Sequence, residues 1–287
     1  MVFKSGDEIN RAVPLSLRVR DRLVIAADAY IEPLVVVLDA YYRALVVLVE
    51  KNSSQFWTHH LGHEEGVHEL SAELPSDDAD RSNPGKAARQ RETHLHWHLR
   101  ATVQAMTRLM AEYECDVSVL AGAEEVTVEL ERLLPDALRA TLAGTIHPSE
   151  KGPGEARAAL VDGALGDYRE RVETAALEEL GLFAGHGLLV GGLDDVLGAV
   201  DEFRVRRLFL SDALAAPGHY CRQHHYLALE GGRCPFDDSE LLPTENVVDE
   251  LVEFTLQHGV DLMLVVRRHD LVDAHGGVAA VLYPPAA

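Results

Sequence analysis

The sequence predicts an α/β protein made of two successive units, the first with a mixed sheet. Three observations support this prediction. Between residues 34 and 71, short apolar or alternating runs are separated by turn residues, as in an antiparallel meander. From residue 87 the apolar period changes to three and four residues, which indicates a long amphipathic helix. After that helix, strand and helix patterns alternate almost to the C-terminus, as they do in α/β folds.

Length and composition narrow the class of protein. The chain has 287 residues, enough for two domains with cores of their own, and its 47% hydrophobic and 25% charged residues are typical of a soluble globular protein. No stretch resembles a secretory signal or a transmembrane helix, and three cysteines, an odd number, fit a reducing cytoplasm. The net charge of -21 disfavours indiscriminate nucleic-acid binding. It does not exclude a local basic patch, because charges are screened over roughly 8 Å.

The first domain is expected over residues 32–150, after a lead-in segment of residues 1–31. Its strand-like runs cover residues 34–38, 44–50, 54–61 and 66–71. A loop rich in Pro, Asp, Ser, Asn and Gly follows at residues 75–86 and leads into the helix, expected over 87–113. The apolar residues that recur along this helix are Leu95, Leu99, Val103, Met106, Leu109 and Met110. The elements that complete the domain are a strand at 116–122, a helix ending before Pro135 and a strand at 142–146.

The second domain is expected over residues 151–287 and begins with a long helix at 156–180. An irregular insert at residues 213–243 interrupts its α/β alternation. A helix should follow the insert, with Thr244 as its N-cap and acidic residues in its first turns. The other expected elements are a helix at 193–203, strands at 205–212, 261–266 and 276–284, and a short helix before the last strand.

A basic segment precedes and opens the long helix of the first domain. Arg81, Lys86, Arg89 and Arg91 are candidates for RNA binding, because arginine forks suit phosphate contacts and a helix N-terminus attracts anions. The alternative is a solvated face whose charges pair with the acidic remainder of the protein. Trp97, further along the helix, is expected to be packed, with base stacking as the alternative.

Two groups of residues have spacings that suit metal binding. His94 and His98 are one helical turn apart but lack an obvious third ligand, so a structural role is the favoured interpretation. The insert contains the sharper candidate, a possible zinc site with two short ligand pairs separated by a Gly-Gly turn. The four candidate ligands are Cys221, His224, Cys234 and Asp237. Because Asp is an unusual ligand of structural zinc, a metal-free hairpin is the alternative.

The order of these elements resembles the archaeo-eukaryotic class I peptide chain release factors and Pelota, in their divergent bacterial, Balon-like branch. The resemblance covers roughly residues 30–287. The segments that carry it are LVVVLDAYYRALVVLVE, RQRETHLHWHLR, VSVLAG, VRRLFLSD, CRQHHYLALEGGRCPFD and GGVAAVLY.

This resemblance implies an RNase H-like middle domain followed by an α/β/α domain like the kink-turn-binding ribosomal proteins, with a small hairpin insert. Members of the superfamily imitate a tRNA, enter the ribosomal A site and usually bind a translational GTPase through the C-terminal domain. Many carry a zinc-binding minidomain with C-x-x-C pairs, where this chain has His224 and Asp237 in the second and fourth positions.

Two departures from the family pattern bear on function. Release factors need Gly-Gly-Gln in the loop before the long helix, whereas this loop reads NPGKAARQ, with Gly85 as its one glycine and Gln90 expected inside the helix. The family's codon-reading N-terminal domain has no counterpart in residues 1–31. Peptidyl-tRNA hydrolysis and stop-codon decoding are therefore not expected.

The sequence thus predicts a cytoplasmic, tRNA-mimicking factor that contacts ribosomal RNA of the A site and a translational GTPase, and neither DNA nor membranes. Its role would be rescue or hibernation, as in Pelota-type and Balon-type factors. The first alternative is an enzyme: a peptidyl-tRNA hydrolase that uses Gln90, or a nuclease that uses carboxylates such as Asp39, Glu50 and Asp116. The second is an RNA-binding or protein-interaction module that acts away from the ribosome.

Overall fold

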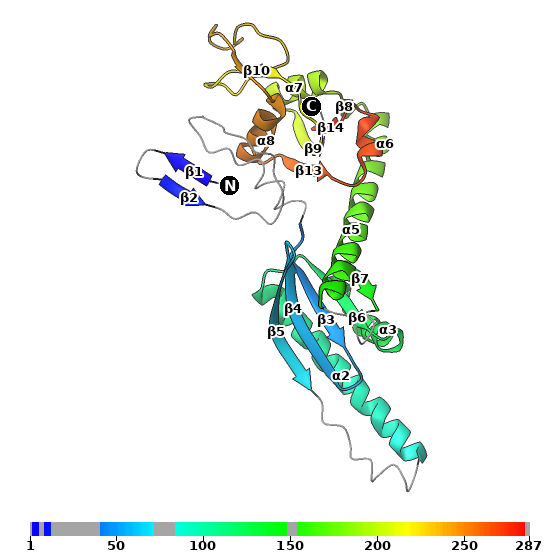
Figure 1. Cartoon of the computed structure of the whole chain (residues 1–287). Coiled ribbons are helices and arrows are strands. Elements are labelled where there is room, and N and C mark those ends of the chain that lie inside the picture. The colour runs from blue at the N-terminus through cyan, green and yellow to red at the C-terminus, as the bar shows by residue number, and fades with distance from the viewer. Residues whose placement is uncertain (1, 6–8, 13–40, 72–83, 148–153, 285–287) are drawn as a thin grey trace. The chain divides into compact units, whose positions relative to one another are not determined.

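The computed structural model describes residues 2–5, 9–12, 41–71, 84–147 and 154–284 (Figure 1). The chain divides into two compact units, Tyr41–Tyr168 and a second that combines Met1–Ala40 with Arg169–Ala287. Helix α5 (Gly154–Glu178) contributes its first half to one unit and its second half to the other. The domain boundaries expected after residues 31 and 150 lie outside the described residues, as does the expected strand at 34–38.

A five-stranded mixed sheet forms the centre of the first unit. Its strands are β3 (Ala44–Val49), β4 (Ser53–His60), β5 (His63–Ser71), β6 (Val117–Gly122) and β7 (Leu142–Ile146), in the order β5-β4-β3-β6-β7. The meander β3-β4-β5 is antiparallel as predicted, whereas β6 is parallel to both β3 and β7. The central strands β3 and β6 are apolar at almost every position because helices cover both faces of the sheet.

Three helices cover one face of this sheet, and the first half of α5 covers the other. The three are α2 (Pro84–Glu112), α3 (Glu124–Leu133) and the short α4 (Asp136–Ala140). All six apolar residues whose spacing predicted the long helix lie in or against the core beneath α2. This arrangement of strands and helices confirms the expected RNase H-like fold of the first unit.

The second unit is an α/β/α sandwich, also as expected. Its sheet contains β8 (Leu189–Gly191), β9 (Val205–Ser211), β13 (Asp261–Val265) and β14 (Val278–Leu282), in the order β13-β9-β14-β8. Helices α7 (Leu193–Asp201) and α8 (Val247–Gln257) pack on one face. The second half of α5, α6 (Leu180–Gly185) and α9 (His269–Asp273) cover the other. The sequence did not predict α6 and β8, because the glycines of GLFAGHGLLVGG interrupt the apolar pattern of both elements.

The insert forms a small sheet of its own. Its strands are β10 (Gly218–Tyr220), β11 (Leu227–Ala228) and β12 (Leu242–Thr244), with β10 in the middle. Thr244 pairs with Gly218 in this sheet, so the prediction that it caps α8 is wrong. The N-cap is Asn246, whose side chain accepts a hydrogen bond from the backbone of Val248. The lead-in segment contains an unpredicted antiparallel pair, β1 (Val2–Ser5) and β2 (Ile9–Ala12).

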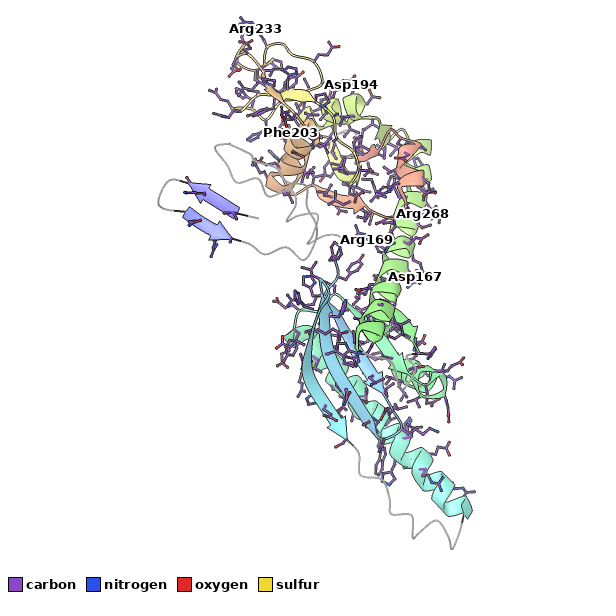
Figure 2. The ribbon with its side chains drawn as sticks, in the orientation of Figure 1. Asp167, Arg169, Asp194, Phe203, Arg233 and Arg268 are labelled. Atoms are coloured by element: carbon purple, nitrogen blue, oxygen red, sulfur yellow. The ribbon has the colours of Figure 1, made fainter. Side chains whose placement is uncertain are left out.

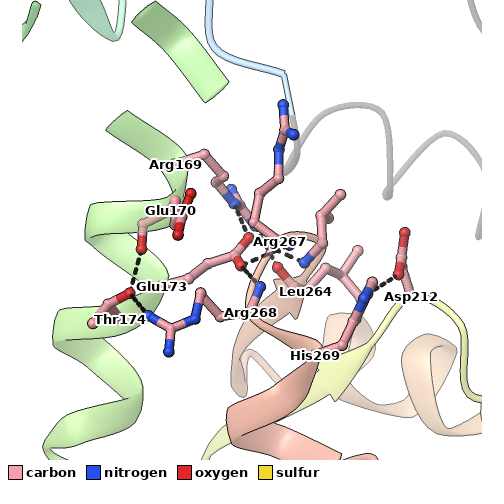
Figure 3. A network of polar contacts seen from close by, with 10 residues as sticks. Arg169, Glu170, Glu173, Thr174, Asp212, Leu264, Arg267, Arg268 and His269 are labelled. Atoms are coloured by element: carbon pink, nitrogen blue, oxygen red, sulfur yellow. Dashed lines mark hydrogen bonds and ion pairs between the residues drawn. The ribbon is translucent and has the colours of Figure 1, made fainter. Parts of the chain in front are cut away.

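A buried ion pair joins the second half of α5 to the segment after β13 (Figure 3). Arg169 and Glu173, one turn apart on α5, are 5% and 0% exposed, and Arg169 Nε donates to Glu173 Oε1 at 2.8 Å. The Glu173 carboxylate also accepts hydrogen bonds of 2.9–3.0 Å from the backbone of Val266, Arg267 and Arg268. Burial disfavours the charged carboxylate, but these hydrogen bonds outweigh burial and lower the pKa of Glu173.

Candidate functional site

The N-terminal part of α2 carries the described members of the predicted RNA-binding set. Pro84 opens the helix, where its missing N–H costs no helical hydrogen bond. Arg89 and Arg91 are both exposed. Arg81 and the side chain of Lys86 lie outside the described residues. The structure therefore places two of the four predicted arginine and lysine side chains, and both face solvent.

Trp97 extends this exposed surface along α2. Its side chain is 63% exposed, so the expectation that it packs in the core is wrong. The ring of His94 approaches the indole edge to face, with 5.9 Å between centroids. Arg100, three residues further on, is also exposed and lies on the same side of the helix. Helical phase was the signal for this exposure, because 100° per residue puts position 97 about 160° from the buried Leu99.

His98 follows Trp97 in the helix, 100° further around its axis, and is part of the core. It is 4% exposed, and its Nε2 is 2.9 Å from Ser54 Oγ on β4. The Ser54 hydroxyl is also 2.9 Å from Thr102 Oγ1, which donates in turn to the His98 carbonyl. These hydrogen bonds give His98 the structural role that the sequence favoured over metal chelation with His94.

The insert contains the same turn twice, with one pair of candidate ligands on each. In the first knuckle turn (Cys221–Tyr226) the N–H of Cys221 donates to the Tyr226 carbonyl, and the N–H of His225 donates to the Cys221 carbonyl, at 2.8 and 2.9 Å. In the second (Cys234–Ser239) the equivalent bonds join Cys234 to Ser239 and Asp238 to Cys234, at 2.8 and 3.0 Å.

Each turn depends on one residue with a left-handed backbone. The fifth residue is His225 in the first turn, with φ 52°, and Asp238 in the second, with φ 59°. Histidine and aspartate tolerate this region better than most residues other than glycine. The repeat presents the first and fourth residues of each turn in equivalent positions, and these are the four predicted ligands, Cys221, His224, Cys234 and Asp237.

The distances between the donor atoms suit a tetrahedral metal ion. His224 Nδ1 is 3.7 Å from Cys221 Sγ, 3.6 Å from Cys234 Sγ and 3.6 Å from Asp237 Oδ2. All four donor atoms lie within 4.8 Å of one another. Zinc bonds of about 2.0–2.3 Å place tetrahedral ligands about 3.3–3.8 Å apart. The donor set thus fits a zinc ion.

Neighbouring groups prepare these side chains for metal binding. Asp237 Oδ1 accepts hydrogen bonds from the Ser239 hydroxyl and backbone, at 2.7 and 3.0 Å. These bonds orient the carboxylate so that its other oxygen, Oδ2, faces His224. Burial disfavours the thiolate of Cys221, but hydrogen bonds from His224 and the turn backbone outweigh burial and lower its pKa to about 7. A thiolate is the form of cysteine that binds metals.

No catalytic constellation emerges among the described residues. Gln90 lies in the seventh position of α2, and Asp39 and the side chain of Gln90 are outside the described residues. Asp116 accepts a hydrogen bond from the backbone of Arg43, and Glu50 accepts one from Ser53, so each has a local structural role. In the described part of the chain, the knuckle residues form the one group of three or more His, Cys, Asp or Glu that suits a metal.

The fold agrees with comparisons with known proteins. The sequence profile of the family described as "Bacterial archaeo-eukaryotic release factor family 10" matches residues 30–168. Over these residues, just under half of its length, the chain resembles a divergent bacterial release factor. No curated protein matches its sequence.

Solved structures that are similar to this chain include three from archaea and yeast. A model of ribosome-bound archaeal Pelota has a TM-score of 0.54 at 16% identity, over 85% of this chain and 62% of that one. S. cerevisiae Dom34 has a TM-score of 0.53 at 11% identity, over 91% and 70%. The archaeal termination factor aRF1 has a TM-score of 0.31 at 17% identity, over 86% and 63%. The chain spans less than two thirds of the length of aRF1 and of archaeal Pelota.

Among the described helices, none is both long and apolar enough to cross a lipid bilayer.

Proposed function

We propose that this chain is a cytoplasmic, ribosome-associated factor of the rescue or hibernation type, which imitates a tRNA in the A site. Its contact with ribosomal RNA is the α2 surface, formed by Arg89, Arg91, His94, Trp97 and Arg100 together with Arg81 and Lys86. The match of residues 30–168 to a bacterial release factor family supports ribosome association. The chemistry of the α2 surface supports RNA as the contacted component.

The exposed Trp97 is the observation that carries this proposal. A side chain of this size normally buries most of its surface, yet 63% of Trp97 faces solvent on a helix whose other face supplies a complete core. Bases stack on exposed aromatic rings with about 1–3 kcal/mol each, and neighbouring arginines bind phosphates. Arg89, Arg91 and Arg100 are exposed on the same helix, so stacking and phosphate contacts are available together.

The proposed factor does not hydrolyse peptidyl-tRNA. Release factors flank their glutamine with glycines, whose backbone freedom lets the side chain approach the ester bond. Here Gln90 has a helical backbone within α2, and Gly85 is the nearest glycine. A helix fixes the backbone dihedral angles, which supports a non-hydrolytic role.

We also propose that the knuckle residues Cys221, His224, Cys234 and Asp237 bind a structural zinc ion, since their donor atoms have tetrahedral spacing. Bound zinc would cross-link the two turns, which is a structural role and not a catalytic one. The second unit would bind a translational GTPase. S. cerevisiae Dom34, which has the same fold, is described as interacting with Hbs1, and this supports a partner protein for the present chain.

Sedimentation with purified bacterial ribosomes over a range of salt concentrations tests the α2 surface. Replacing Lys86, Arg89 and Arg91 with alanine should weaken binding and flatten its log-log salt dependence by about one unit per lost phosphate contact. Trp97→Ala should weaken binding about 5- to 100-fold with the salt slope unchanged, because stacking releases no counterions.

The matched control is Arg132→Ala, which removes an exposed arginine from α3 of the same unit and should leave binding unchanged. If the α2 variants bind ribosomes with the affinity and salt dependence of the wild-type protein, the α2 surface is not the contact. Peptide release from ribosomes loaded with peptidyl-tRNA, abolished by Gln90→Ala, would instead favour the hydrolase. Absence of ribosome binding by the wild-type chain would favour a module that acts elsewhere.

A further inference from the structure

Phe236 is an exposed aromatic residue on the second knuckle turn. Its side chain is 59% exposed, whereas the core residues of the knuckle are buried, with Cys234 at 2% and Leu241 at 5%. Its ring lies 5.4 Å from the ring of His224 and 6.4 Å from that of Tyr226, measured between centroids. Phe236 thus contacts the knuckle on one side and faces solvent on the other.

The backbone on both sides of Phe236 is held in place. It is the residue immediately before the candidate ligand Asp237, and two hydrogen bonds close its turn, from Cys234 to Ser239 and from Asp238 to Cys234. A rigid aromatic residue loses little conformational entropy when a partner binds it. Exposed aromatic residues held in this way are frequent anchors of protein interfaces.

The charge around Phe236 indicates whether RNA or a protein binds there. The insert carries four carboxylates, one of them that of the candidate ligand Asp237, against two guanidinium groups. One of the two, Arg233, is labelled in Figure 2. It pairs with Asp238 at 3.0 Å. Glu230 and Glu240 are exposed. Phosphate groups would be repelled by this surface, whereas lysine and arginine side chains would be attracted to it and could also contact the phenyl ring.

We propose that the knuckle surface, formed by Phe236 with Glu230 and Glu240, is a docking surface for a basic segment of a ribosomal protein. The proposal rests on the ribosome association proposed above and adds a second contact of opposite chemistry. The α2 surface offers arginines and an indole ring to RNA. The knuckle surface offers carboxylates and a phenyl ring to a basic protein.

A photocrosslinking amino acid identifies what the knuckle surface contacts. The protein carrying p-benzoylphenylalanine in place of Phe236 is irradiated with purified bacterial ribosomes, and the crosslinked component is identified. The control carries the same group in place of Phe203, which is 62% exposed in the same unit (Figure 2). We expect a crosslink to one ribosomal protein from position 236 and none from position 203. A crosslink to ribosomal RNA, or none despite ribosome binding, would overturn the proposal.

Charge reversal gives a second readout that does not depend on the folding of the turn. Glu240→Lys should weaken ribosome binding about 3- to 30-fold if the partner is basic, and strengthen it if the partner is RNA. Glu202→Lys, an exposed residue beside Phe203, is the matched control and should have no effect. Tighter or unchanged binding of Glu240→Lys overturns the knuckle proposal alone. Failure of the wild-type chain to bind ribosomes overturns this proposal and the proposed function together.

Discussion

Asp201, the last residue of α7, carries an unusual carboxyl group. It is partly buried, and its Oδ1 accepts a hydrogen bond of 3.2 Å from the backbone of Leu227, at the start of β11. Burial raises the pKa of Asp201 from 3.8 to about 7, and Glu202 adds to the rise, while the hydrogen bond from Leu227 opposes it. The folded protein therefore favours the protonated carboxyl group below about pH 7.

The raised pKa of Asp201 predicts a loss of stability as pH rises. The folded state holds this proton up to about pH 7, whereas the unfolded chain releases it near pH 3.8, so the free energy of unfolding falls across this interval. Asp201→Asn keeps an acceptor for Leu227 and removes the charge. Since the carboxyl group is partly exposed, we expect the variant to gain roughly 1–2 kcal/mol relative to the native chain between pH 4 and 8. Urea titrations at several pH values measure this difference, and parallel stability curves would contradict it.

At the scale of elements, one carboxylate fixes the end of β13 to α5. Glu173 accepts three backbone N–H groups and the Arg169 side chain, and Arg169 also donates to the carbonyl of Leu264 on β13. The two residues are one turn apart on α5, whereas their backbone partners lie more than 90 positions further along the chain. This ion pair therefore orders a non-local contact within the second unit.

Removing the charge of Glu173 should destabilise the second unit strongly. Glu173→Gln leaves Arg169 buried without a counter-charge, which typically costs about 3–5 kcal/mol. Because the pKa of Glu173 is lowered from 4.5, its stabilising contribution is present above pH 4.5 and is lost as pH falls through the folded value. The variant should lack this acid-induced loss. Glu179→Gln, the same change at an exposed glutamate just after α5, serves as the control in thermal and acid unfolding.

For the whole molecule, the knuckle is expected to depend on metal while both main sheets do not. Cys221, Cys234 and Leu241 form a small core of their own, distinct from the clusters beneath the larger sheets. Chelation of zinc should therefore increase amide hydrogen exchange across residues 218–244 and leave the strands of the two larger sheets protected.

Asp237→Ala should reproduce the effect of the chelator and lower the zinc content of the purified protein. Asp237→Cys should bind zinc tightly, in contrast to Asp237→Ala, because a thiolate at this position of the second turn is a better zinc ligand than a carboxylate. If the wild-type protein contains no zinc and the amides of the insert are still fully protected, the proposal of a structural metal is wrong.

Local patterns in the sequence predicted most of the elements. The spacing of Leu95, Leu99 and Met106 located α2 and its buried face, because a helix repeats every 3.6 residues whatever it packs against. Glycine-rich segments were harder, because strand β8 is three residues long and has no periodicity to detect. The ligand spacing in the insert was visible in the sequence, although only its folded turns show the donor atoms side by side.

Local sequence patterns were enough to predict the α/β class, the resemblance to release factors, the basic start of α2 and the two C-x-x ligand pairs, because each depends on residues close together in the chain. Which neighbours these residues meet depends on the tertiary fold. The fold put His98 beside Ser54 in the core, made Asn246 rather than Thr244 the N-cap of α8, and joined Glu173 to the backbone after β13. Such contacts follow from the packing of distant segments, and local periodicity contains no information about them.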